Sequence, residues 1–220
     1  MLYIGLSGPM LGGKGTVREI IESKYKTYSL SLSDIVREET RKRGLELIRD
    51  NLVNVADDLR YKHGPGILAE LAIKKVISLG KEAENYEIIL FDSIRNPFEV
   101  KEFRQTLKKH FFLIYVDAPL EIRYERLKKR RREGEEILSF EEFKKKSEEE
   151  FLGREDRKIV EEESDHPEVL DYGVNLSECL KRANAIIIND KSREELEKQV
   201  ISLIEKRKEE IKSGKFDVKE

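Results

Sequence analysis

Short apolar runs separated by longer amphipathic segments set the pattern of this chain. Four runs rich in aromatic or β-branched residues are expected to be buried strands, at residues 2–6, 88–91, 111–116 and 185–188. A weaker run at 27–30 is second in chain order. Helix-length segments lie between the runs, and this alternation is typical of parallel βαβ units. The pattern predicts an α/β protein with a five-stranded parallel sheet flanked by helices.

The length of 220 residues is within reach of one α/β domain. We expect this domain to span residues 1–205, with 206–220 as a charged tail in which a helix frays. Charge also dominates 128–150, where no internal repeat is visible. A solvated helix pair and a lid over a phosphate site both fit that segment.

Composition excludes several classes of protein. The 43 basic and 45 acidic residues nearly cancel to a formal charge of −2, so a protein that coats duplex nucleic acid or anionic lipid is not expected. No apolar stretch approaches the roughly 20 residues that cross a bilayer, and the start of the chain shows no leader signal. We therefore expect a soluble, cytoplasmic protein. The abundance of Lys and Glu and the absence of Trp resemble the composition of hyperthermophile proteins.

A glycine-rich segment follows the first predicted strand. Residues 8–16 read GPMLGGKGT and fit G-x-x-x-x-G-K before a helical segment. Gly8, Gly12 and Gly13 let the backbone fold around phosphate oxygens, while Lys14 neutralises the β- and γ-phosphates. A helix starting near Gly15 points its positive end at the same place. Residues 8–16, called the phosphate loop below, predict binding of a nucleoside triphosphate.

Two further segments present acids and arginines at helical spacing. Asp34, Arg37 and Arg41 fall at i, i+3 and i+7, so one helical face carries an acid and two guanidinium groups that suit a phosphate. A surface helix with internal salt bridges is the alternative. The strand at 88–91 ends before Asp92 and Arg95, where a capping Asp with an Arg partner is the alternative.

These motifs together resemble the adenylate kinase and nucleoside monophosphate kinase family. The loop shares its G-K-G-T, although Met10 and Leu11 replace a usual Pro and Gly. Residues 31–38 are similar to the acceptor motif S-T-G-D-x-x-R, and residues 89–95 resemble a strand ending in D-G-F-P-R, one residue shorter here. Residues 126–130 match the family's R-L-x-x-R. The closest resemblance is to archaeal adenylate kinase-like P-loop proteins, and it is loosest over 133–177.

The resemblance implies a P-loop NTPase fold with ATP and Mg²⁺ as cofactors. It implies an acceptor-binding insertion at about 31–80 and a lid-like charged insertion at about 128–175. The resemblance assigns nucleotide binding to Gly8, Gly12, Gly13, Lys14, Gly15 and Thr16. It assigns metal binding to Thr16 and Asp92. It assigns binding of the acceptor to Asp34, Arg37, Arg41 and Arg95. It assigns catalysis to Lys14, Asp92, Arg95, Arg126 and Arg130, together with Arg154 and Arg157 as arginines of the lid.

Three functions remain open at this point. The leading one is an ATP-dependent kinase acting on a nucleoside or deoxynucleoside monophosphate, whose attacking oxygen is already ionised. A second is transfer to a hydroxyl, as in dephospho-coenzyme A, with Asp34 as the base. A third is a nucleotide-gated module in which the charged region at 128–165 contacts protein or RNA, a hypothesis suggested by the basic run at 128–132. The first two predict a small-molecule nucleotide partner and no membrane or nucleic acid, and the chain is expected to be a monomer or homodimer.

Overall fold

The computed structural model describes residues 1–130, 138–153 and 173–214. Within these residues a five-stranded sheet has the order β2-β3-β1-β4-β5, and every neighbouring pair is parallel. The strands are β1 (Leu2–Ser7), β2 (Thr27–Ser31), β3 (Ile88–Ile94), β4 (Phe111–Asp117) and β5 (Ala185–Ile188). The sheet that the apolar runs predicted is confirmed, and its central strand β1 leads into the phosphate loop.

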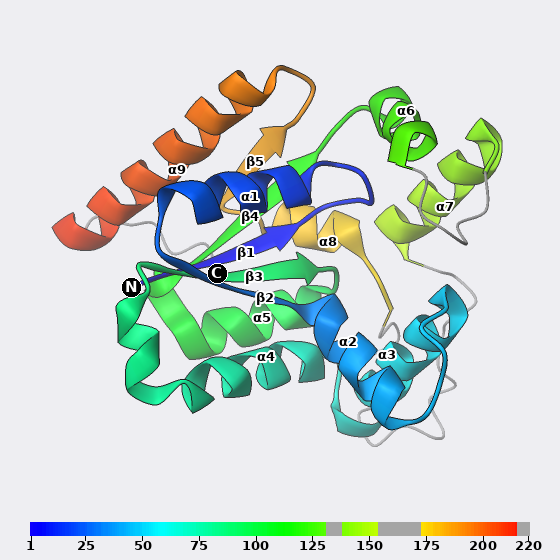
Figure 1. The fold of residues 1–220 in the computed structure, drawn as a ribbon, viewed down its shortest axis with the longest axis horizontal. Coiled ribbons are helices and arrows are strands. Elements are labelled where there is room, and N and C mark those ends of the chain that lie inside the picture. Colours follow the sequence, from blue (N-terminus) through cyan, green and yellow to red (C-terminus); the bar gives the residue numbers. More distant parts are fainter. Residues whose placement is uncertain (131–137, 154–172, 215–220) are drawn as a thin grey trace.

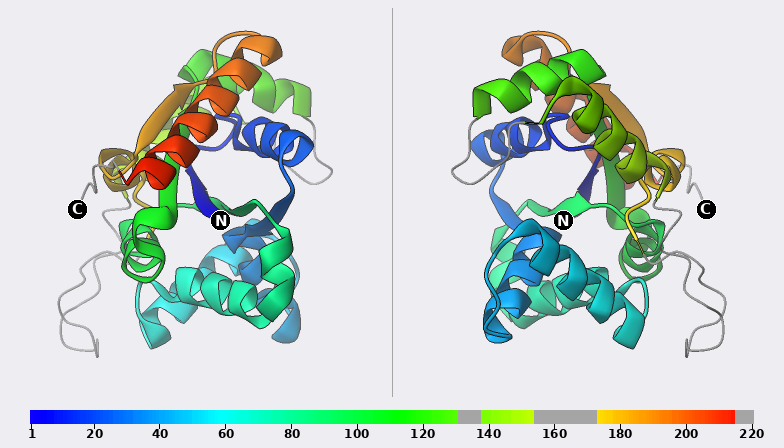
Figure 2. Two further views of the ribbon diagram at one scale, coloured as in Figure 1. Left: turned by 90° about the vertical axis from the view of Figure 1, so that its left-hand side faces the viewer. Right: turned by 90° about the vertical axis from the view of Figure 1, so that its right-hand side faces the viewer.

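Helices cover both faces of the sheet (Figures 1 and 2). One face carries α1 (Lys14–Lys24) and α9 (Arg193–Ser213). The other carries α2 (Leu32–Lys42), α3 (Arg49–His63), α4 (Ile67–Ser78), α5 (Pro97–Leu107) and α8 (Leu176–Lys181). Two short 3₁₀ helices, η1 (Gly80–Asn85) and η2 (Lys108–His110), complete this side. Beyond the carboxyl ends of the strands lie α6 (Leu120–Arg130) and α7 (Phe140–Leu152).

Alternation along the strands divides the core into two layers. Ile4 and Leu6 of β1 pack toward α1 and α9 with other aliphatic residues. On the opposite face the rings of Phe91 and Phe103 have centroids 4.4 Å apart. Cys179 of α8 is completely buried on this second face, and burial raises the pKa of its thiol. Because both layers are apolar, the polar side chains collect at the carboxyl edge of the sheet, where ligands of open α/β sheets bind.

Strand β3 is longer than its apolar run predicts. It continues to Ile94, so Asp92 lies within the strand, and Ser93 takes a left-handed backbone with φ of 67°. The left-handed region costs a non-glycine residue roughly 1–2 kcal/mol, and such residues cluster at functional sites. Ser93 stands where the D-G-F-P-R motif has glycine. The strained residue therefore lies beside the predicted acceptor-binding edge.

Helix α9 also extends further than expected. The boundary predicted at residue 205 falls inside this helix, which ends at Ser213. Arg207, within the predicted tail, is buried and donates to the carbonyl oxygen of Lys109 at 2.7 Å. The helix continues because this contact and Ile204 anchor it to the sheet. None of the helices in the described part of the chain is long and apolar enough to cross a membrane.

Candidate phosphoryl-transfer site

The phosphate loop folds into a concave backbone at the end of β1. Gly8, Leu11 and Gly13 all have positive φ, and Gly13 is the N-cap of α1, which begins at Lys14. Successive kinks of this kind turn backbone N–H groups toward one point, which is how anion-binding nests are built. The N-terminus of an eleven-residue helix adds its partial positive charge there. The geometry suits a polyphosphate.

Two of the loop's glycines are required by close approach as well as by φ. A Cβ on Gly8 would lie 2.0 Å from the carbonyl oxygen of Val116 in β4. A Cβ on Gly13 would lie 1.8 Å from Nδ2 of Asn189, which follows β5 and donates to the carbonyl of Gly12 at 3.2 Å. The loop is therefore pressed onto the ends of two strands, which fixes its shape.

Lys14 folds back over the loop that carries it. Its Nζ donates to the carbonyl oxygens of Gly8 at 2.7 Å and Pro9 at 2.9 Å. Burial, followed by the nearby charge of Arg95, lowers the pKa of Lys14 to about 8, although Asp92, Glu150 and Asp117 act in the opposite direction. The Lys14 ammonium is thus held by two backbone carbonyls, with Arg95 and three carboxylates close enough to act on its charge.

Nucleotide binding is expected to depend on pH through Lys14. With a pKa of about 8 in the free chain, Lys14 is mostly protonated at pH 7 and mostly neutral at pH 9, and a polyphosphate favours the protonated form. The Kd for ATP should rise up to about tenfold from pH 7 to pH 9. Binding above pH 8 should take up a proton, measurable by calorimetry in two buffers of different ionisation enthalpy. The Lys14→Ala variant should show no such uptake, and zero uptake by the unsubstituted chain would contradict the assignment.

Glu150 of α7 joins the phosphate loop to two arginines. Its Oε2 accepts from the backbone N–H of Met10 at 3.5 Å, and its Oε1 accepts from Arg95 at 3.2 Å and Arg49 at 3.4 Å. The Glu150 side chain is only 10% exposed. Burial raises the pKa of Glu150, but Arg95, Arg49 and Lys14 outweigh it, so the net shift is downward and the group is an anion. Glu150 therefore places a negative charge between the phosphate loop and the two arginines.

Arg95 is placed by a buried carboxylate on α5. Glu99 is 1% exposed, and its Oε2 accepts from the backbone N–H groups of Arg95 at 3.0 Å and Asn96 at 3.1 Å. Its Oε1 accepts from Arg60 of α3 at 2.9 Å. Asn96 and Glu99 form the capping box of α5, with Pro97 in the first turn. The turn that presents Arg95 is therefore fixed by α3 and α5 together.

The arginines of α6 bind backbone and connect the loop to α7. Arg126 donates to the carbonyl oxygens of Leu11 at 3.0 Å and Asn189 at 2.8 Å. Arg123 donates to Ser147 of α7 at 3.3 Å, and its guanidinium lies 5.7 Å from the ring centroid of Phe143. Arg130 is the last residue of α6 and is partly exposed. Arg126 therefore supports the shape of the loop in the ligand-free chain.

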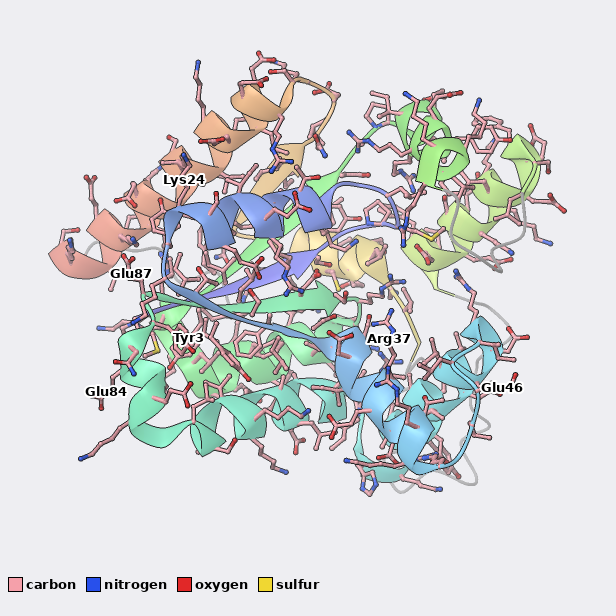
Figure 3. The ribbon with its side chains drawn as sticks, in the orientation of Figure 1. Tyr3, Lys24, Arg37, Glu46, Glu84 and Glu87 are labelled. Atoms are coloured by element: carbon pink, nitrogen blue, oxygen red, sulfur yellow. The ribbon has the colours of Figure 1, made fainter. Side chains whose placement is uncertain are left out.

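The predicted acceptor residues of α2 do not reach Glu150. Arg37 donates to Asp34 at 2.8 Å, as the salt-bridged surface alternative predicted, and the Asp34 side chain is 63% exposed. Arg41 is exposed further along the helix. Figure 3 shows Arg37 on the side of the molecule where the strands end. Among the described residues, only Arg95 of the four predicted acceptor residues contacts the carboxylate beside the loop.

The remaining predicted residues are placed as follows. Thr16 is partly buried in the first turn of α1. Asp92 accepts from the N–H of Ser93 at 2.6 Å. It lies close enough to Lys14 for its charge to act upward on the pKa of Lys14. Arg154 and Arg157 lie outside the described residues. Within the described ranges there is no group of three or more His, Cys, Asp or Glu side chains able to hold a metal ion.

Four residues at the site escaped the sequence analysis: Arg49, Glu99, Glu150 and Asn189. A signal for Glu150 was present, because Phe143, Ser147 and Glu150 fall at i, i+4 and i+7 and form the inward face of α7. Asn189 directly follows the apolar run at 185–188, and this position at a strand end is a signal that could have marked it. Arg49 and Glu99 gave no sequence signal beyond ordinary helical charge.

Comparisons with known proteins place the chain in a family. A family model described as an AAA domain matches residues 4–153. A UPF0200 protein of Thermococcus gammatolerans is 35% identical over 196 residues, covering 88% of this chain and 90% of the relative. A UPF0200/UPF0201 protein of Archaeoglobus fulgidus is 37% identical over 146 residues, covering 66% of this chain and 44% of that protein.

A solved structure agrees with the fold. The shikimate kinase of Bacteroides thetaiotaomicron superposes with a TM-score of 0.50 at 14% identity, covering 93% of this chain and 98% of that chain. This likeness concerns the fold, which is that of a P-loop kinase. The family model and the Thermococcus relative both cover more than half of the chain. The chain therefore belongs to the UPF0200 family, and its residues 4–153 match the model of an AAA domain.

Proposed function

We propose that this chain is an ATP-dependent kinase that transfers the γ-phosphoryl group to a nucleoside or deoxynucleoside monophosphate. The observation that carries the proposal is the meeting of two sets of positive groups at one buried carboxylate. The phosphate loop contributes the N–H of Met10 and the charge of Lys14, and the opposite side contributes Arg49 and Arg95. This placement of positive groups on two sides supports phosphoryl transfer, which needs the donor and acceptor phosphates to be held close together and their charge to be stabilised.

The loop and its surroundings fit the cofactors that the family resemblance implies. The concave backbone at Gly8–Gly13 and the ammonium of Lys14 would hold the polyphosphate of ATP. Thr16 and Asp92 would hold Mg²⁺, which in kinases is bound by one or two protein oxygens together with phosphates. When bound, the ion neutralises charge on the β- and γ-phosphates. No cluster of protein carboxylates is needed for such a site.

The environment of Asp34 favours a phosphate acceptor over a hydroxyl acceptor. A hydroxyl acceptor needs a base close to the attacking oxygen. Asp34 is largely exposed, and its Oδ1 accepts a hydrogen bond from Arg37 at 2.8 Å, so this oxygen is already engaged by a partner. A monophosphate is already ionised near pH 7, so it needs no base. It needs arginines that bind its negative charge. Arg95 and Arg49 supply them.

A phosphotransfer screen separates the candidate functions. Purified chain with ATP and Mg²⁺ is offered nucleoside and deoxynucleoside monophosphates, dephospho-coenzyme A and nucleosides, and products are separated by chromatography. We expect transfer to at least one monophosphate, with kcat of the Asp34→Asn variant within about threefold of the unsubstituted chain. Transfer only to a hydroxyl, with a large loss of kcat in Asp34→Asn, would support the second function. ATP binding without any transfer, together with salt-sensitive retention of RNA, would support the binding module.

A further inference from the structure

The carboxylate of Glu150 lies between the phosphate loop and the two arginines Arg49 and Arg95. We propose that Arg49 and Arg95 form a clamp for the phosphate of the acceptor, and that Glu150 fills this clamp until the acceptor displaces it. The proposal rests on the proposed function, because it names the residues that select the acceptor of that reaction. It assigns the binding role to Arg49, on α3, in place of Arg37 and Arg41 on α2.

The contacts of Glu150 are those of a bound anion. Both guanidinium groups reach the same oxygen, Oε1, at 3.2 Å and 3.4 Å, while Oε2 faces the N–H of Met10. The carboxylate thus bridges the acceptor side and the donor loop. Two guanidinium groups on a single carboxylate oxygen leave most of their N–H donors unused. A phosphate offers three oxygens and up to two charges, so it would satisfy the clamp better.

The chain provides a second sign that the clamp awaits a ligand. Nε of Arg95 is buried and has no hydrogen-bond partner among the described residues. A buried donor without a partner is costly, and most buried donors in native structures are satisfied. The backbone of Arg95 is fixed by Glu99, so the side chain is held in place while part of its bonding capacity stays open. An anion larger than a carboxylate would supply the missing acceptor for Arg95.

Little besides the ion pair joins α3 to the end of α7. Ile48, next to Arg49 in the sequence, is 52% exposed, and Leu152, two residues after Glu150, is 67% exposed. The Arg49 side chain is 55% exposed, so water competes with this ion pair and weakens it. The other half of α7 is anchored, since Phe143 is fully buried and Ser147 bonds Arg123. The end that carries Glu150 can therefore leave the clamp while the beginning of α7 stays in place.

Equilibrium binding tests the clamp without relying on turnover. A panel of nucleoside and deoxynucleoside monophosphates is titrated by calorimetry into the unsubstituted chain and the Glu150→Gln and Arg49→Ala variants. Glu150→Gln should bind the preferred monophosphate about tenfold more tightly, because the internal competitor loses its charge. Arg49→Ala should bind it at least about tenfold more weakly. Glu148→Gln on the exposed side of α7 and Arg193→Ala on α9 are matched controls, and both should leave the affinity unchanged.

Every outcome decides the matter. Unchanged affinity in both variants, or no monophosphate bound by any of them, would overturn the clamp. Circular dichroism melting of each variant excludes misfolding as the cause of weaker binding, and the gain expected for Glu150→Gln cannot come from misfolding. Monophosphate binding that follows the predicted order without product formation would support the clamp and contradict the kinase. Phosphoryl transfer to a monophosphate that is unaffected by Arg49→Ala would support the kinase and contradict the clamp.

Discussion

Replacing Lys14 by alanine is expected to lower kcat/KM for phosphotransfer by about a thousandfold. The ammonium is the charge of the phosphate loop itself, and in the ligand-free chain it donates to the carbonyls of Gly8 and Pro9. ATP must draw it from these carbonyls onto the β- and γ-phosphates, where it meets negative charge as the phosphoryl group leaves. Removing one preorganised donor of this kind usually costs a factor of 100 to 1,000, and here a full charge is lost.

The measurement is initial rates across ATP concentrations for Lys14→Ala beside Lys26→Ala, an exposed lysine at the opposite end of the sheet. Lys26→Ala should match the unsubstituted chain. The melting temperature of Lys14→Ala should not fall, because burial lowers the pKa of Lys14 and the fold gains nothing from holding its charge. Retained kcat/KM in Lys14→Ala would contradict the role given to the loop. A lost melting transition would show instead that the loop had collapsed.

Replacing Glu99 by alanine is expected to reduce the free energy of unfolding by about 3–5 kcal/mol. The guanidinium of Arg60 is 5% exposed and would be left without its principal partner in the core. The N–H groups of Arg95 and Asn96 would lose their acceptor at the same time. At roughly 2–4 °C for each kcal/mol in a chain of this size, the melting temperature should fall by about 10 °C.

Thermal and urea unfolding measure the effect of Glu99→Ala directly. Lys101→Ala, an exposed change two residues along the same helix, is the control and should stay within about 0.5 kcal/mol. The double variant Arg60→Met with Glu99→Leu should recover part of the lost stability, because it removes the unpaired charge together with its partner. A loss below about 1 kcal/mol in Glu99→Ala would show that Arg60 finds another partner.

The sheet and the phosphate loop were predictable because both depend on local patterns. Buried parallel strands are continuous apolar runs, and GPMLGGKGT combines glycine spacing with a lysine between a strand and a helix. The end of β3 was not predictable, because Ser93 adopts a left-handed backbone that its side chain does not favour. The length of α9 was missed for a related reason. A charged residue, Arg207, is buried by a contact with the distant Lys109.

The acceptor side was the harder part, since it is defined by tertiary contacts between charged residues. Arg37 has the spacing of a phosphate ligand, but its neighbour Asp34 pairs with it. Arg49 belongs to no motif that the sequence shows. It reaches Glu150 only because α3 begins beside the end of α7. Within the acidic run at 148–150, Glu150 is the buried member, and charge alone does not distinguish it. Which charge turns inward follows from Phe143 and Ser147, whose positions fix the rotation of α7.

The burial of Cys179 has a consequence for the covalent chemistry of the whole chain. This residue is the only thiol in the sequence, and it lies fully buried on the inward face of α8, where burial raises its pKa. A thiol that is protonated and shielded reacts slowly with oxidants and with other thiols. A disulfide between two copies would require α8 to detach from the core first. In the folded chain this thiol is therefore protected from oxidation and from disulfide exchange.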